Sequence, residues 1–178
     1  MLDLACGTGD IAFEAAAAGG VVTGVDLTPR MIELAARKAK APAVFLVGDM
    51  AALPIAAGAF DVVTTGYGLR NVPDLATALR EIHRVLKPGG VCCSLDFDRP
   101  ENSVIRAMYL GYLTVVGSAL GLVLHRDPDT YRYIPASIRR YPGARGVAAM
   151  MRDCGFTDVR VVPVFAGLMA IHVGKKGT

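Results

Sequence analysis

Three carboxylates stand beside short apolar runs in the first third of the chain, next to a glycine-rich turn. Asp3 precedes the turn Gly7-Thr8-Gly9, and Asp26 and Asp49 follow the next two apolar runs. Glycine lets the backbone turn sharply and approach a ligand closely, and a helix that begins after the turn presents free N–H groups. A carboxylate at the end of a strand can accept hydrogen bonds from both hydroxyls of a ribose. These features predict a site for a nucleoside-bearing cofactor.

The glycine spacing alone does not identify that cofactor, because Gly7-x-Gly9-x-x-Ala12 also fits a dinucleotide fingerprint. Asp3 would repel a pyrophosphate, whereas a cofactor with an ammonium and a sulfonium would tolerate it. Asp49 and Met50 are suited to the amino group and the ring of an adenine. These residues favour S-adenosyl-L-methionine over a nicotinamide dinucleotide, and a dehydrogenase remains the less favoured alternative.

The composition narrows the class of protein. The chain has 178 residues, of which 53% are hydrophobic, and a formal net charge of +3, so we expect a folded domain and no nucleic-acid partner. The four cysteines form no CxxC pair and the three histidines are far apart in sequence, which predicts no metal site.

Short β-rich runs alternate with helical runs, which is typical of an α/β fold with a doubly wound, mainly parallel sheet. Two closing strands joined by a short loop predict an antiparallel hairpin at the C-terminal edge, giving seven strands in one domain over residues 1–178. The strands are expected at residues 2–5, 21–25, 44–47, 61–65, 91–97, 158–162 and 168–173. The helices are expected at residues 10–18, 29 to about 40, 74–86, 107–124 and 146–154.

Several longer motifs carry a resemblance to a known family. The run from Asp3 to Asp10 is similar to the first motif of the class I methyltransferases, which have a Rossmann-like fold. The resemblance to the ubiquinone/menaquinone biosynthesis C-methyltransferase family is narrower and extends from residue 2 to residue 176. It rests on Gly68-Leu69-Arg70-Asn71-Val72, His83-Arg84-Val85-Leu86-Lys87-Pro88-Gly89-Gly90, Tyr131-Arg132-Tyr133 and Ser137-Ile138-Arg139.

The resemblance implies an S-adenosyl-L-methionine-dependent enzyme and gives roles to individual residues. Asp26 is expected to hold the ribose, and Asp49 and Met50 the adenine. The methionine end would be held by Asp3, Gly7, Thr8 and Gly9, and the remaining expected cofactor contacts are Ala5, Leu27 and Gly66.

Four residues are expected to act on the acceptor. We expect Arg70 to stabilise a developing quinolate, directly or through a water, and Asn71 to orient it; a surface ion pair is the alternative for Arg70. Tyr131 and Tyr133 are expected to pack on the acceptor ring or bond its oxygens, with core packing as the alternative. The general base is unassigned.

The resemblance also implies the substrate, a polyprenyl quinol methylated at a ring carbon in menaquinone or ubiquinone biosynthesis. Another phenolic acceptor, and a non-catalytic cofactor-binding module, are the alternatives. Residues 99–142 are expected to form a substrate-covering insertion, because Ala107 to Leu124 carries no charge. A membrane span is the less favoured alternative for this run. We expect peripheral contact with the inner face of the membrane from the cytoplasm, and leave a homodimer open.

Two features depart from the family pattern. The chain begins within its first expected strand, and the resemblance implies preceding helices, so we expect a domain truncated at its N-terminus. Asp96 and Asp98 stand where the family often has a glutamate and a serine. The first change keeps the charge and the second alters the local polarity.

Overall fold

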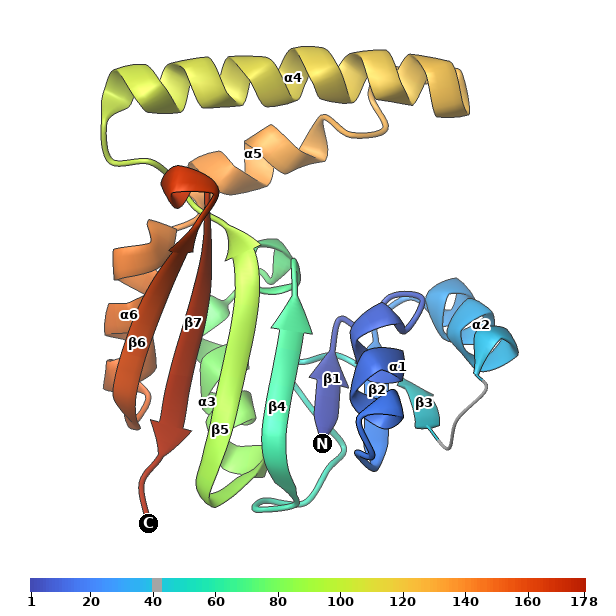
Figure 1. Ribbon diagram of the computed structural model, residues 1–178, viewed down its shortest axis with the longest axis vertical. Coiled ribbons are helices and arrows are strands. Elements are labelled where there is room, and N and C mark those ends of the chain that lie inside the picture. The colour runs from blue at the N-terminus through green and yellow to red at the C-terminus, as the bar shows by residue number, and fades with distance from the viewer. Residues whose placement is uncertain (40–42) are drawn as a thin grey trace.

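A seven-stranded sheet of order β3-β2-β1-β4-β5-β7-β6 organises the chain (Figure 1). The computed structural model describes residues 1–39 and 43–178, without the side chain of His125. Strands β1 to β5 are parallel, and β7 runs antiparallel to both β5 and β6, which confirms the predicted sheet and its edge hairpin. The strands are β1 Leu2–Leu4, β2 Val22–Asp26, β3 Ala43–Val47, β4 Phe60–Gly66, β5 Leu86–Phe97, β6 Phe156–Val164 and β7 Met169–Lys176.

The helices lie on both faces of the sheet and above its upper edge. In Figure 1, α1 is in front of the sheet, α3 and α6 are behind it, and α4 and α5 cross above the ends of the strands. The helices are α1 Asp10–Ala17, α2 Pro29–Lys38, α3 Leu75–Val85, α4 Ser103–His125, α5 Tyr133–Arg140 and α6 Gly143–Asp153, with short 3-10 turns η1 Leu69–Asn71 and η2 Phe165–Gly167.

Helix α3 shows how the sequence produces this packing. Asp74 caps its first turn by accepting a hydrogen bond from the Thr77 amide at 3.1 Å. Its apolar residues recur every three or four positions, so Leu79 and Ile82 fall on one side and are fully buried against the sheet. The main core therefore lies between α3, α6 and the strands they cover.

The register of the parallel strands brings the acidic residues to one edge. Asp3 lies beside Gly24 of β2 and Thr64 of β4. Asp26 ends β2 and Gly66 ends β4, so the segments that follow both strands leave the sheet on the same side. This edge is also the one that α4 and α5 overhang (Figure 1).

Some element bounds differ from the sequence-based predictions. Helix α6 begins at Gly143 rather than residue 146, and β5 begins at Leu86, which pairs with Phe60 before residues 87–90 interrupt the ladder. Helix α5 was not predicted because it is short and contains Pro135. The helix tolerates this proline because it lies in the first turn, where backbone N–H groups have no partner within the helix. The expected end of α2 near residue 40 lies outside the described residues.

Helix α4 contains the long uncharged run, residues 107–124, for which the sequence predicts a helix. Residues Ser103–Leu124 are long and apolar enough to cross a membrane by length and composition, and 17% of the most apolar window is buried. Its inner side packs on α5 through Tyr109, Leu110 and Ile138, and the Tyr109 hydroxyl donates to the Leu168 carbonyl at 3.0 Å. Its outer side leaves large apolar side chains exposed.

Candidate active site

A cavity of about 480 Å³ lies at the carboxyl ends of β1, β2 and β4. It is lined by most of the residues expected to hold the cofactor, namely Ala5, Gly7, Asp26, Leu27, Asp49, Met50 and Gly66. These residues come from four separate segments of the chain, and the parallel sheet brings them together because each segment follows a strand at the same edge. We call this space the donor cavity.

Asp26 shapes the glycine turn from the neighbouring strand. Its carboxylate accepts the Gly7 amide at 2.9 Å through Oδ2 and the Thr28 amide at 2.8 Å through Oδ1. Gly7 has a φ of 54°, a left-handed conformation that glycine adopts at little cost. The Asp26 oxygens keep further lone pairs, so the same carboxylate that fixes the turn can accept from ligand hydroxyls.

Asp3, Thr8 and Gly9 do not line the donor cavity, although they were expected to hold the cofactor. Asp3 is only 1% exposed and accepts the Thr64 hydroxyl at 2.7 Å through Oδ1. Its Oδ2 is buried without a hydrogen-bond partner among the described residues. Burial raises the pKa of Asp3 to about 6, and the Thr64 hydrogen bond opposes the rise.

Asp49 and Met50, which follow β3, form another part of the cavity wall. Asp49 is exposed and accepts the Ala51 amide at 2.8 Å through Oδ1, which fixes the start of the loop after β3. Met50 is buried, while Leu27 and Met31 contribute exposed apolar surface to the same cavity. This wall therefore offers an apolar surface with a carboxylate beside it, which suits a flat ring that carries an amino group.

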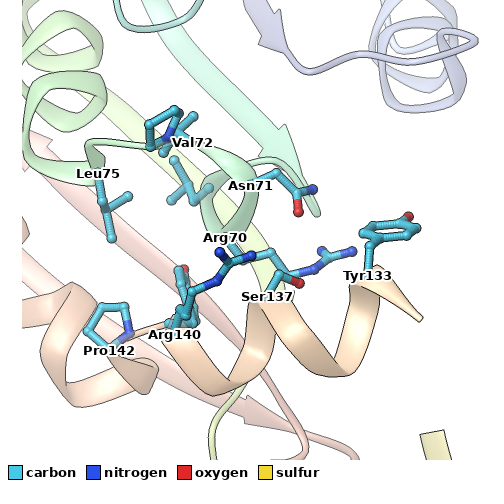
Figure 2. A pocket seen from close by; sticks show the side chains of 11 residues that line it. Arg70, Asn71, Val72, Leu75, Tyr133, Ser137, Arg140 and Pro142 are labelled. Carbon is cyan, nitrogen blue, oxygen red and sulfur yellow. The ribbon is translucent and has the colours of Figure 1, made fainter. Parts of the chain in front are cut away.

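A second cavity of about 440 Å³ lies between η1, the start of α3, and α5. We call it the acceptor cavity. It shares Asn71, Val72, Pro73 and Tyr133 with the donor cavity, so the two spaces meet at these residues. Figure 2 shows Asn71 on the η1 side and Tyr133 and Ser137 on α5, with Arg70 and Arg140 between the two elements.

Arg70 lines the acceptor cavity, but its side chain is only 3% exposed and belongs to a buried ion pair. Its Nη1 donates to Asp96 Oδ1 at 2.7 Å and to the Tyr67 carbonyl at 2.9 Å, and its amide donates to Asp96 Oδ2 at 3.1 Å. The guanidinium carbon lies 4.9 Å from the Phe97 ring centre and 5.6 Å from that of Tyr67. The alternative of a surface ion pair is therefore wrong, and the charge that was expected to face the acceptor is already matched by Asp96.

Asn71 and Tyr133 lie where the cavities meet, whereas Tyr131 does not. The Asn71 Nδ2 donates to the Tyr67 carbonyl at 3.0 Å, which leaves the amide oxygen as an acceptor. Tyr133 is 52% exposed and borders both cavities. Tyr131 is half-buried and packs close to α4, because a Cβ at Gly117 would lie 3.2 Å from the Tyr131 Cβ.

Tyr67, Gly68 and Asp96 are among the residues of the site that the sequence analysis missed. Tyr67 and Gly68 line the donor cavity immediately after β4, where the rule for strand ends could have located them. A Cβ at Gly68 would lie 2.7 Å from the Ala5 Cβ, so the cavity wall requires glycine there. Asp96 was noticed only as a departure from the family, and its pairing with Arg70 joins positions 26 residues apart.

Solved structures share the fold. An S-adenosylmethionine-dependent methyltransferase from Methanosarcina mazei matches with a TM-score of 0.70 and 22% identity, over 99% of this chain and 91% of that one. Phosphoethanolamine N-methyltransferase 2 from Haemonchus contortus, in complex with phosphomonomethylethanolamine and S-adenosylhomocysteine, matches with a TM-score of 0.73 and 17% identity, over 100% and 48% of the two chains. The class I methyltransferase fold expected from the sequence is confirmed.

Sequence relatives are closer. Demethylmenaquinone methyltransferase of Geobacillus kaustophilus is 37% identical over 182 residues, covering 98% of this chain and 78% of the relative. The enzyme of the same name from Staphylococcus aureus is 39% identical over 180 residues, covering 98% and 75%. The sequence model of one family matches residues 1–176, almost the whole length, and the chain therefore belongs to the ubiE/COQ5 methyltransferase family.

Proposed function

We propose that this S-adenosyl-L-methionine-dependent methyltransferase methylates a ring carbon of demethylmenaquinol, a lipophilic naphthoquinol. The relatives named above support this choice between the two quinol classes that the sequence left open. The structural observation that carries the proposal is the meeting of the two cavities at Asn71, Val72, Pro73 and Tyr133. A methyl group has to pass between donor and acceptor in line, so the two binding spaces must share a wall or an opening.

The donor cavity fits S-adenosyl-L-methionine in charge and in shape. Gly68 leaves space that a Cβ would fill, 2.7 Å from the Ala5 Cβ, and the two acids that line the cavity suit a cofactor that carries positive charge and no phosphate. Asp26 can accept from ribose hydroxyls, and Asp49 beside Met50 from an adenine amino group. When bound, the cofactor supplies an electrophilic methyl group on a sulfonium.

On the acceptor side, we expect Asn71 and the ion-paired Arg70 to orient the quinol. The Asn71 amide oxygen can accept from a ring hydroxyl at the point where the cavities meet. Arg70 would act through position: its guanidinium ties Asp96 to the Tyr67 carbonyl and so holds the turn that carries Asn71. Tyr133 would cover the ring and exclude water from the reacting carbon.

Residues 99–142 would form the cover of this site and its approach from the membrane. Figure 1 shows α4 and α5 lying across the strand ends. The outer side of α4 exposes Met108, Val115 and Val123, which are 71%, 70% and 78% accessible. A polyprenyl quinol is nearly insoluble in water, so an exposed apolar helix beside the acceptor cavity would give access from the inner face of the membrane by peripheral contact.

Turnover on a water-soluble analogue tests the reaction separately from membrane contact. The purified chain, S-adenosyl-L-methionine and a short-chain demethylmenaquinol are incubated under reducing conditions, and the product is examined for a ring methyl group by mass spectrometry and NMR. A short-chain methoxy-benzoquinol run in parallel is expected to react at least tenfold more slowly. No ring methylation of either quinol, by a chain that binds S-adenosylhomocysteine, would refute the proposal.

A further inference from the structure

Three arginines converge beneath the first turns of α4, away from the donor and acceptor cavities. Arg99, Arg106 and Arg139 line a cavity of about 500 Å³, and Ser103, Ala107, Leu110 and Gly111 of α4 complete its wall. Arg99 comes from the segment after β5 and Arg139 from the end of α5, so the fold gathers the three charges from three segments. None of these residues lines the other two cavities.

The positive charge of this cavity is not neutralised by its surroundings. Within the described residues, Arg99, Arg106 and Arg139 form no salt bridge, and Arg106 makes only one side-chain bond, to the Pro100 carbonyl at 3.2 Å. In the described part of the chain, the two nearest acids in sequence form no salt bridge with these arginines. Glu101 pairs with Arg145 at 3.1 Å, and Asp98 Oδ1 accepts the amides of residues 99 and 144. A concave site with three uncompensated guanidinium groups is complementary to a phosphate.

The same turns of α4 carry exposed apolar side chains beside the cavity. Val104, Ile105 and Met108 are 65%, 52% and 71% exposed, and they alternate along the helix with the cavity residues Ser103, Arg106 and Ala107. A ligand with its phosphate among the arginines would therefore meet apolar surface within one helical turn. That order of chemistry, an anionic group next to a hydrocarbon, is the order of a phospholipid.

We infer that the cavity of Arg99, Arg106 and Arg139 binds the phosphate of an anionic glycerophospholipid and anchors the start of α4 on the membrane. The inference rests on the proposed function only in assigning the outer side of α4 to the membrane. It adds a defined headgroup site, which fixes where the helix touches the surface and therefore how the acceptor cavity faces the quinol pool.

A second copy of the chain is the competing occupant of the outer side of α4. The arginine cavity opens beside that side and favours a polyanionic surface, because two copies meeting there would each bring uncompensated positive charge. Light scattering distinguishes the two cases. A mass of one chain without lipid supports the inference, and a stable dimer that fails to bind vesicles would overturn it.

Vesicle co-flotation tests the site. Wild type is expected to bind phosphatidylcholine vesicles that contain phosphatidylglycerol more tightly than pure phosphatidylcholine vesicles. The triple variant Arg99→Gln/Arg106→Gln/Arg139→Gln is expected to lose on the order of 100-fold in partitioning to the mixed vesicles, at about fivefold per arginine. A matched control, Arg37→Gln/Arg152→Gln/Arg160→Gln, removes the same charge from exposed positions outside the cavity and is expected to lose less than tenfold.

Two further arms separate the causes of failure. Equal losses in the two triple variants would overturn the headgroup site, because attraction would then be general to the protein's charge. At constant ionic strength, inorganic phosphate should displace less wild-type protein from the vesicles than soluble glycerophosphoglycerol does. Stronger displacement by phosphate would assign the cavity to free phosphate and overturn the inference of a lipid site. A wild type that binds vesicles but does not methylate the short-chain quinol would refute the proposed function alone.

Discussion

Replacing Asp96 by asparagine should destabilise the protein strongly, because it leaves the Arg70 charge buried without a partner. The carboxylate is 1% exposed and accepts three hydrogen bonds, two from Arg70 and one from the Phe97 amide at 2.8 Å. Burial raises the pKa of Asp96, and the Arg70 charge opposes that rise. The charge of Arg70 therefore stabilises the ionised form of Asp96. Removing one member of a buried pair costs about 3 to 5 kcal/mol.

The size of the effect can be narrowed from the geometry. Asparagine is nearly isosteric and keeps one acceptor oxygen, so the bond to the guanidinium survives in part while the second oxygen is replaced by a donor. We therefore expect Asp96→Asn to lower the free energy of unfolding by about 3 kcal/mol. In urea denaturation, with a slope of about 2 kcal/mol per molar, the midpoint should fall by about 1.5 M at an unchanged slope.

A double variant separates the effect of the ion pair on stability from its effect on the position of the Tyr67 turn. Arg70→Met/Asp96→Leu removes both charges and fills a similar volume, and such replacements are often neutral or stabilising. It should recover most of the lost stability while turnover on the short-chain quinol stays at least tenfold below wild type, because the Tyr67 turn loses its tie. A loss below about 1 kcal/mol in Asp96→Asn, or a double variant with normal turnover, would refute the assigned role.

Three other substitutions test the remaining parts of the site. The pKa of Asp3 is raised to about 6 in the native state, so ionisation of Asp3 costs stability as the pH rises from about 4 through 6. Asp3→Asn should therefore increase the free energy of unfolding at pH 8 by up to about 3 kcal/mol. Urea titrations should show no such gain at pH 3. Gly68→Ala should weaken S-adenosylhomocysteine binding at least tenfold by calorimetry, since the added Cβ would lie 2.6 Å from a threonine oxygen. Gly111→Ala is the control and should not weaken binding, because its added Cβ would have no atom within 4 Å. Tyr133→Ala should lower kcat/KM for the quinol at least tenfold, and Tyr131→Ala should lower it less than threefold. Similar losses for the two variants in steady-state assays would contradict the placement of Tyr133, and not Tyr131, at the cavities.

The donor half of the site could be predicted from sequence because it is built from local signals. Asp26 is the last residue of β2 and Asp49 follows β3 by two residues, and the parallel sheet brings these strand ends together. Asp26 illustrates both the success and its limit. Its place at the cavity followed from the strand end, but its bonds to the amides of Gly7 and Thr28 depend on the packing of two turns that no local pattern encodes.

The acceptor half was harder because its contacts join distant positions. Arg70 and Asp96 are 26 residues apart, and the local sequence around either residue does not predict that they pair. Arg70 was expected to face the acceptor, but a charge enclosed by rings and backbone needs a matched partner, which Asp96 supplies. Helix α5 was missed for a related reason: tertiary packing under α4 stabilises a short helix whose proline weakens its local signal.

The two halves are linked through one carbonyl. Tyr67 has a φ of 58°, a left-handed conformation that costs about 1 kcal/mol or more in a tyrosine, and its oxygen accepts from both Arg70 Nη1 and Asn71 Nδ2. Tyr67 itself lines the donor cavity, whereas Arg70 lines the acceptor cavity and Asn71 lines both. A ligand that presses on the turn after β4 therefore acts on the bonds that position Asn71. Cofactor binding and acceptor orientation should be coupled by this turn, and the buried Asp96 supports both because it fixes the arginine that holds it.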